Sequence, residues 1–118
     1  MSRVVHFEIP AEEPERAIKF YKKVFGWQID EWGGPFNYWL VKTGEEDEPG
    51  IDGAIMLKSD FPMVRHTIIV DSIEECVEKI EGESGEVVMP KKGIPDVGSI
   101  AFFKDTEGNI SGIIEPLK

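Results

Sequence analysis

The same order of predicted strands and helix occurs twice in the sequence. Each copy begins near one of the only two histidines, His6 and His66. In each half a β-rich segment runs directly into a segment with helical spacing of apolar residues, 4–9 into 13–24 and 66–71 into 72–80. Segments with the alternation and turn residues of hairpin strands follow each helix. The repeat therefore predicts two similar strand-helix units, whose first strands could bring the two histidines to one shared site.

Both predicted helices have clear start signals and apolar stripes. Pro14 suits the first turn of the first helix and Gly26 ends it, whereas Ser72 with Glu75 three residues later predicts a capping box for the second. The predicted buried stripes are Ala17, Phe20, Tyr21 and Val24 in the first helix, and Ile73, Cys76, Val77 and Ile80 in the second.

The remaining segments complete a βαβββ pattern in each half. Strands are predicted at 27–32, 37–42 and 53–58, and again at 86–90, 99–104 and 110–115, with a loop at 91–98 and a tight turn at 105–109. We expect an α+β fold in one domain, 1–118, with units of approximately 1–59 and 64–118. Their sheets should pair into a curved mixed sheet around a cleft, with the helices on the outer faces.

Composition excludes several classes of partner. A net charge of −10 opposes binding to nucleic acid and to anionic lipid. No apolar run approaches the roughly 18 residues of a membrane span, and the N-terminus enters a strand without the apolar stretch of a signal peptide. Cys76 has no second cysteine to pair with. We therefore expect a soluble, cytoplasmic protein that contacts neither nucleic acid nor membrane.

Four features together resemble the vicinal oxygen chelate superfamily, which includes glyoxalase I, bleomycin-resistance proteins and extradiol dioxygenases. They are His6, the string at 20–27 (FYKKVFGW), Val70-Asp71-Ser72 before the second helix, and the turn at 105–109 before the last strand. The resemblance covers essentially the whole chain. It implies a homodimer and, in metal-dependent members, a divalent ion such as Zn, Ni, Mn or Fe. The first and last strands of each unit would each supply one ligand of that ion.

The ligand positions implied by this resemblance are mostly occupied by other residue types. Strand alternation places His6 on the cleft side, whereas the other three positions fall on Met56, Arg65 and Gly112. His66 shares the parity of Ile68 and Val70, so only a β-bulge would turn it into the cleft. Glu115 would also need a bulge, and we expect it to be a surface charge. A lone strand histidine does not hold a catalytic ion tightly, so we expect no metal cofactor.

The same alternation predicts an apolar and aromatic cleft with a few polar groups, typical of a small-molecule site. The candidate catalytic residue is His6, and the candidate ligand-binding residues are Glu8, Trp39, Met56, Arg65, Thr67 and Phe102. Alternation leaves open whether Trp39 or Tyr38, and Phe102 or Phe103, faces the cleft. Arg65 could pair with a carboxylate or phosphate of a ligand, or with Glu8 inside the protein.

Three functions fit these residues. The favoured one is a glyoxalase/bleomycin-resistance-like protein that binds a small anionic or aromatic molecule without the usual metal. The second is a metal-dependent lyase, isomerase or dioxygenase in which bulges bring His66 and Glu115 to His6. The third is a dimeric structural module whose cleft is filled by side chains.

Overall fold

The computed structural model describes residues 2–117, and the chain divides into two compact units. One unit is His6–Val64, and the other consists of Arg65 onward together with the residues before His6. The Arg3 carbonyl oxygen accepts a hydrogen bond of 2.9 Å from the backbone N–H of Ile69, which ties the start of the chain to the second half.

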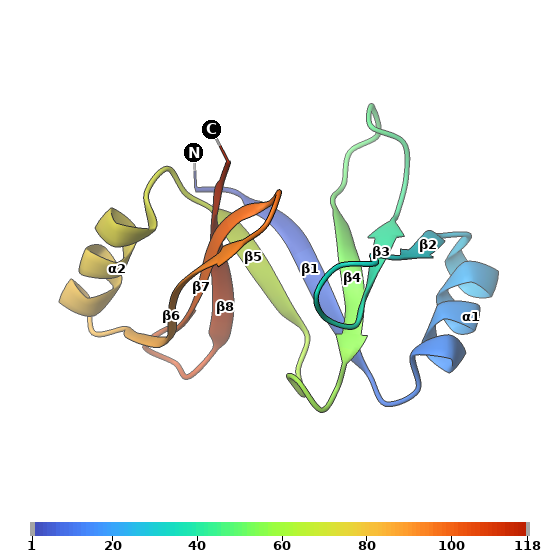
Figure 1. Ribbon diagram of the computed structural model, residues 1–118, viewed down its shortest axis with the longest axis horizontal. Coiled ribbons are helices and arrows are strands. Elements are labelled where there is room, and N and C mark those ends of the chain that lie inside the picture. The colour runs from blue at the N-terminus through green and yellow to red at the C-terminus, as the bar shows by residue number, and fades with distance from the viewer. Residues whose placement is uncertain (1, 118) are drawn as a thin grey trace. The chain divides into compact units, whose positions relative to one another are not determined.

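The first unit contains β1 (Val4–Ala11) from His6 onward, α1 (Pro14–Phe25), β2 (Gln28–Glu31), β3 (Tyr38–Lys42) and β4 (Asp52–Leu57). Its strands lie in the order β2-β3-β4-β1. The β1–β4 pair is parallel, and the other two pairs are antiparallel. In Figure 1 this unit runs from blue to green, and α1 lies alongside its strands. These elements form the predicted βαβββ unit.

The apolar core of this unit lies between α1 and one face of the sheet. Its buried residues are Ala11, Ile29, Val41 and Ile55, with Phe7, Ile9, Ala17, Ile18, Tyr21, Trp27 and Trp39 packed around them. Gly26 ends α1 in the left-handed conformation, φ 71°, as the sequence predicts.

The predicted buried stripe of α1 is wrong at two positions. Phe20 and Val24 are each 55% exposed. Ile18, which lies nearer the opposite side of the helix, packs on the core together with Ala17 and Tyr21. The helix is thus rotated relative to the stripe that its hydropathy pattern indicates, and two large apolar side chains are left in solvent.

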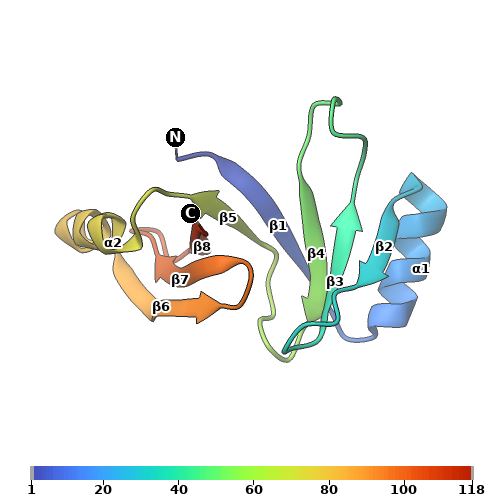
Figure 2. The same ribbon diagram turned by 45° about the horizontal axis from the view of Figure 1, so that its top comes forward.

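The second unit repeats the order with β5 (Arg65–Ile69), α2 (Ile73–Gly82), β6 (Glu86–Ile94), β7 (Gly98–Lys104) and β8 (Ile110–Pro116). Its strands lie in the order β5-β8-β7-β6, again with one parallel pair, β5–β8. Figure 2 shows α2 beside these strands. Strand β6 extends to Ile94, through part of the predicted 91–98 loop. Register shifts beside Met89 allow this edge strand to continue past Pro90, which has no N–H to donate.

The core of the second unit follows the predicted pattern closely. Val70, Ile73, Ala101 and Ile113 are buried, and Ile68, Cys76, Val77, Ile80 and Phe103 pack on them. The Ser72 hydroxyl accepts a hydrogen bond of 3.2 Å from the backbone N–H of Glu75, which confirms the predicted N-cap of α2.

Both halves therefore fold as βαβββ units with mixed strand pairing, and the α+β fold class is confirmed. Among the described residues, no helix is both long and apolar enough to cross a membrane.

Candidate functional site

In the first unit, polar candidate residues lie on the sheet face away from α1. Phe7, Ile9 and Ile55 belong to the α1-side core, so His6, Glu8 and Met56, their neighbours in sequence, point to the opposite face. Tyr38 is in register with Met56 and shares this face. Trp39 packs in the α1-side core and not on the face predicted for the ligand-binding residues.

Tyr38 joins His6 and Glu8 in a continuous chain of hydrogen bonds. Its hydroxyl donates to Glu8 Oε2 over 2.6 Å and lies 2.6 Å from His6 Nε2. Because the single hydroxyl proton is directed at Glu8, the Tyr38 oxygen accepts the Nε2–H of His6. This imidazole–phenol–carboxylate group is called the His6–Tyr38–Glu8 cluster below.

The cluster depends on a strand that contributes none of its polar groups. Strand β4 lies between β1 and β3, so Tyr38 must reach across it to meet His6 and Glu8. Ala54, which is fully buried, is in register with Glu8 on β1 and with Leu40 on β3. Its small side chain leaves room for the Tyr38 ring above β4. The Glu8 residue is only 7% exposed, so its carboxylate is held within the protein.

In the second unit, Arg65 is stacked on an aromatic ring on the sheet face away from α2. Its guanidinium carbon lies 3.9 Å from the centroid of the Phe102 ring. Phe103, the neighbour of Phe102, packs in the α2-side core, which settles the choice between these two residues. Thr67 is buried and lies beside Gly112, its register partner on β8. Alternation therefore places Arg65, Thr67 and Phe102 on the face that the sequence predicts.

Gly112 has little room for a larger side chain. A Cβ atom at this position would lie 3.0 Å from Phe102 Cε1 and 3.1 Å from Thr67 Oγ1. Phe102 and Thr67 therefore limit the space at this ligand position implied by the resemblance.

His66 and Glu115 lie on the α2 side of the second sheet. Strand β5 pairs with β8 in unbroken register over Thr67, Ile68 and Ile69, and Ile68, which shares the parity of His66, packs in the α2-side core. His66 Nε2 lies 3.3 Å from the Ser111 hydroxyl. Glu115 Oε1 accepts a hydrogen bond of 2.9 Å from the backbone N–H of Ile73, so this carboxylate caps the start of α2. Glu115, which the sequence predicts to be a surface charge, is thus bound to the N-terminus of α2.

The residues at the inherited ligand positions do not fit a divalent metal ion. His6 Nε2 is engaged with the Tyr38 hydroxyl at 2.6 Å, Met56 offers a thioether, and Arg65 is a cation. Within residues 2–117 no group of three His, Cys, Asp or Glu side chains is arranged to hold a metal.

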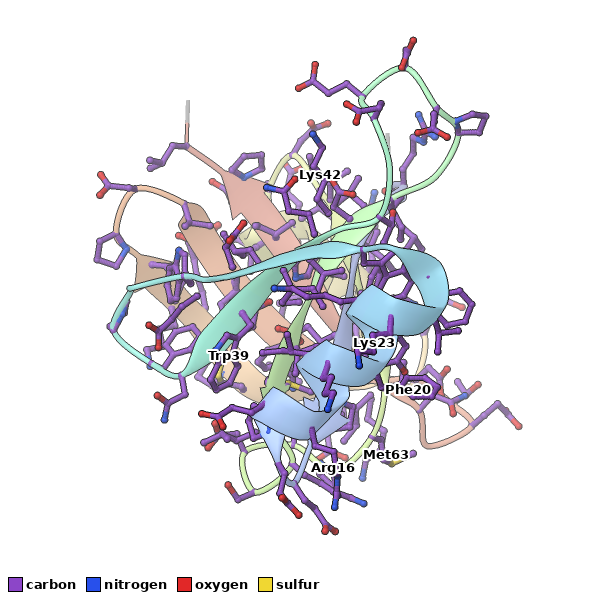
Figure 3. The ribbon with its side chains drawn as sticks, turned by 90° about the vertical axis from the view of Figure 1, so that its right-hand side faces the viewer. Arg16, Phe20, Lys23, Trp39, Lys42 and Met63 are labelled. Atoms are coloured by element: carbon purple, nitrogen blue, oxygen red, sulfur yellow. The ribbon has the colours of Figure 1, made fainter. Side chains whose placement is uncertain are left out.

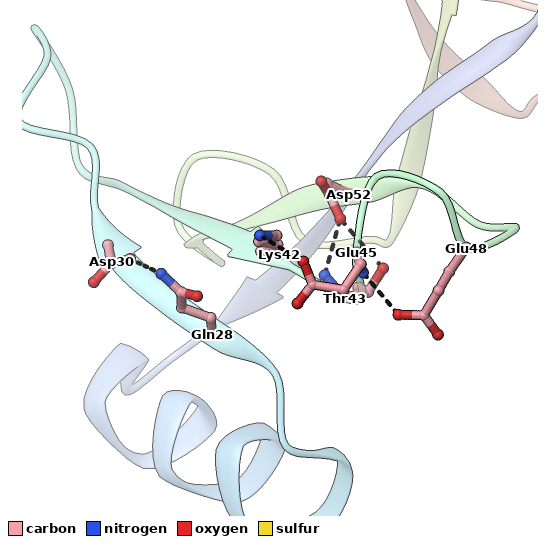
Figure 4. A network of polar contacts seen from close by, with 7 residues as sticks. All are labelled: Gln28, Asp30, Lys42, Thr43, Glu45, Glu48 and Asp52. Carbon is pink, nitrogen blue, oxygen red and sulfur yellow. Dashed lines mark hydrogen bonds and ion pairs between the residues drawn. The ribbon is translucent and has the colours of Figure 1, made fainter.

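The acidic loop after β3 is closed by its own carboxylates (Figure 4). Asp52 Oδ1 accepts hydrogen bonds from the Thr43 backbone N–H, at 2.9 Å, and from its hydroxyl, at 3.3 Å. Glu48 accepts from the Glu45 N–H at 2.8 Å, and Lys42 pairs with Glu45 at 3.5 Å. These contacts explain the acidic residues as loop structure.

Sequence alternation named Tyr38 only as the alternative to Trp39, and the structure selects Tyr38. The signal was present in β3, where Val41 shares the parity of Trp39 and is the apolar, β-branched residue of that strand. A buried Val41 on the helix side places Tyr38 on the opposite face.

Comparison with known proteins identifies the family. Residues 3–44 match the family model described as bleomycin resistance protein-like N-terminal. A glyoxylase-like domain-containing protein of Didymella fabae is 30% identical over 112 residues, covering 90% of this chain and 88% of that protein. CFP32 of Mycobacterium bovis, for which a glyoxylase role is proposed, is 29% identical over 114 residues. This chain spans only 42% of the length of CFP32.

Solved structures share the fold over nearly the whole chain. Methylmalonyl-CoA epimerase of Mycobacterium tuberculosis superposes with a TM-score of 0.68 at 16% identity, covering 98% of this chain and 88% of the epimerase. Hypothetical protein BH1468 of Bacillus halodurans gives 0.74 at 12% identity, covering 99% and 96%. The fold is that of the vicinal oxygen chelate class. With the Didymella relative, it shows that the chain belongs to the glyoxalase/bleomycin-resistance family of that superfamily.

Proposed function

We propose that this protein binds a small anionic molecule with an aromatic or apolar part, without a divalent metal ion. The observation that carries the proposal is the Arg65 guanidinium held 3.9 Å above the Phe102 ring. A guanidinium stacks through its face and binds a carboxylate or phosphate through the N–H groups in its plane, so one arginine can contact both an aromatic ring and an anion. The Phe102 ring beside it offers an apolar surface for the rest of the ligand.

The His6–Tyr38–Glu8 cluster supports the same proposal from the first unit. A few fixed polar groups in an apolar surface are the usual means by which small-molecule sites orient a ligand. Here the imidazole and the phenol are already held by bonds of 2.6 Å, so a ligand does not have to order them.

Ligand-induced thermal stabilisation tests the anion proposal. Benzoate and phenyl phosphate serve as probes at millimolar concentration, against acetate and inorganic phosphate as anions without a ring. We expect the aromatic anions to raise Tm of the wild type and of Arg3→Met, but not of Arg65→Met. Arg3→Met removes an exposed guanidinium and leaves the Arg3 backbone carbonyl in place. An undiminished rise in Arg65→Met, or no rise with any anion, contradicts the proposal.

Metal content tests the second half of the proposal. Protein purified without a histidine tag is assayed for Zn, Ni, Mn and Fe by mass spectrometry. We expect substoichiometric metal that does not change in His6→Ala. A stoichiometric metal that is lost in His6→Ala would contradict binding without a metal ion, whatever the anion probes show.

A second candidate function is metal-free proton transfer, which the His6–Tyr38–Glu8 cluster favours. A hydrogen-bonded imidazole, phenol and carboxylate form a path along which a proton can move. Solved structures with this fold include a methylmalonyl-CoA epimerase in complex with methylmalonyl-CoA. Methylmalonyl-CoA in D₂O is therefore a suitable probe. Deuterium incorporation that Tyr38→Phe and Glu8→Gln abolish would support proton transfer. No incorporation by the wild type would contradict proton transfer and leave ligand binding as the only proposed function.

A further inference from the structure

Helix α1 presents large apolar side chains to solvent. Phe20 and Val24 are each 55% exposed, Phe25 is 59% exposed, and no residue of the helix is fully buried. In Figure 3, which looks onto α1, Arg16, Phe20 and Lys23 project from the helix away from the strands behind it. Exposed apolar side chains grouped on one element, rather than scattered, indicate a surface that another molecule covers.

The same face carries a stripe of positive charge. Arg16, Lys19 and Lys23 are exposed and follow one another at intervals of three and four residues, so they lie on one side of the helix. Phe20 and Val24 border this stripe. Four basic side chains and one acidic side chain give α1 a net charge of +3, although the chain as a whole carries −10. A partner for this face must therefore be acidic.

Helix α2 carries the complementary pattern. Glu74, Glu78 and Glu81 are exposed on its outer side at intervals of four and three residues. Four glutamates and one lysine give α2 a net charge of −3. Its apolar side chains pack inward on the core of the second unit, so the outer face is acidic along its length.

We propose that α1 of one copy docks antiparallel on α2 of a second copy of this chain. In that orientation the basic spacing of three then four residues matches the acidic spacing read from Glu81 back to Glu74. Arg16 meets Glu81, Lys19 meets Glu78, and Lys23 meets Glu74. Because each residue rises about 1.5 Å along a helix, the three pairs stay in register over about 10 Å. The second helix also covers Phe20 and Val24 at the edge of the stripe.

The central pair of this contact, Lys19 with Glu78, is the most informative of the three. Arg16 pairs with Glu13 at 2.8 Å, and Glu74 pairs with Lys91 at 2.6 Å, so these residues exchange one exposed partner for another. Lys19 and Glu78 form no ion pair with any residue in the described part of the chain. They gain a partner only in the docked pair, and a change at either position tests the contact directly.

The size of the contact sets the expected strength. A helix of 12 residues is about 18 Å long, and one helix-on-helix contact falls below the roughly 800 Å² per partner of a standard interface. Self-association through this contact is therefore weak and falls as salt is raised.

Charge exchange between two variants tests the docking. Sedimentation velocity on the full chain at 20 mM and 300 mM NaCl measures self-association of the wild type, Lys19→Glu and Glu78→Lys. We expect association of the wild type at low salt, reduced about tenfold or more in each single variant, since an attraction becomes a repulsion. An equimolar mixture of the two variants should associate again. The carboxylate introduced on α1 of one variant faces the ammonium group introduced on α2 of the other only in this register.

Control variants separate this contact from general charge effects. Lys92→Glu changes the net charge by the same amount on the exposed part of β6 and should leave association unchanged. Circular dichroism establishes that each variant is folded. Association that each single variant loses and the mixture regains supports the docking, whether it forms dimers or longer assemblies, since the contact joins different surfaces and can close or extend. A wild type that is monomeric at low salt, or a variant mixture that does not regain association, overturns it.

Discussion

Replacing Tyr38 by Phe should destabilise the protein measurably, since it removes one oxygen atom and little else. The ring keeps its contacts with Trp32 and Phe36, at centroid distances of 5.6 and 5.5 Å. The lost hydroxyl donates to Glu8, a residue that is 7% exposed, and accepts from His6. A hydrogen bond to a charged group contributes roughly 1.5–3 kcal/mol, and a buried acceptor deprived of it adds to the cost. We expect a loss of about 2–3 kcal/mol.

Urea denaturation followed by tryptophan fluorescence measures this loss, and differential scanning calorimetry measures Tm. For 118 residues the unfolding entropy is about 0.25 kcal/mol/K, so Tm should fall by roughly 8–12 °C. Tyr21→Phe is the matched control. The Tyr21 ring stacks on Trp27 at 4.9 Å, but its hydroxyl makes no hydrogen bond with a described residue. Equal stability of the two variants would refute the role of the Tyr38 hydroxyl.

Three further predictions concern backbone space, acidity and thiol reactivity. Gly53→Ala should cost about 3 kcal/mol in urea denaturation, because its Cβ would overlap the backbone oxygen and ring of Phe7, whereas Gly93→Ala, with open space, should cost little. Backbone N–H groups of its own turn lower the pKa of Asp105. The lowered pKa contributes to the free energy of unfolding at pH values above the unfolded pKa of Asp105, and this contribution is lost as pH falls through the folded pKa. Asp105→Asn should therefore show a smaller loss of stability than the wild type below about pH 4. Equal slopes for both proteins would contradict it. Burial raises the pKa of Cys76, so its thiol should react with a disulfide reagent more slowly in the native protein than in urea; equal rates would disprove protection by burial.

Most of the fold could be predicted from local patterns. Both helices begin and end within two residues of their predicted limits, because Pro14, Gly26 and Ser72 act through the backbone next to them. The sequence predicts an end to β6 at Pro90, because Pro90 and Gly93 are loop signals, whereas the strand continues to Ile94. An edge strand tolerates them when the ladder shifts register.

The candidate site could be predicted only in part. Alternation assigned Arg65 to the face away from α2, where the structure places it on Phe102, but it left Phe102 and Phe103 undecided until the packing of Phe103 in the core chose between them. It left Trp39 and Tyr38 undecided, since both are large aromatic residues that suit either face of a strand. The contact between Glu115 and the start of α2 was also invisible, as it joins positions 42 residues apart.

The sequence by itself determined the two βαβββ units and the parity of His6, because both follow from the spacing of apolar residues along one strand or helix. Tertiary structure alone decided what His6 touches. Its meeting with Tyr38 and Glu8 depends on the register of β1, β4 and β3, and on a small Ala54 between them. Tertiary structure also decided which side of α1 is covered. Hydropathy marks Phe20 and Val24 as apolar, but only packing shows that their own unit leaves them exposed.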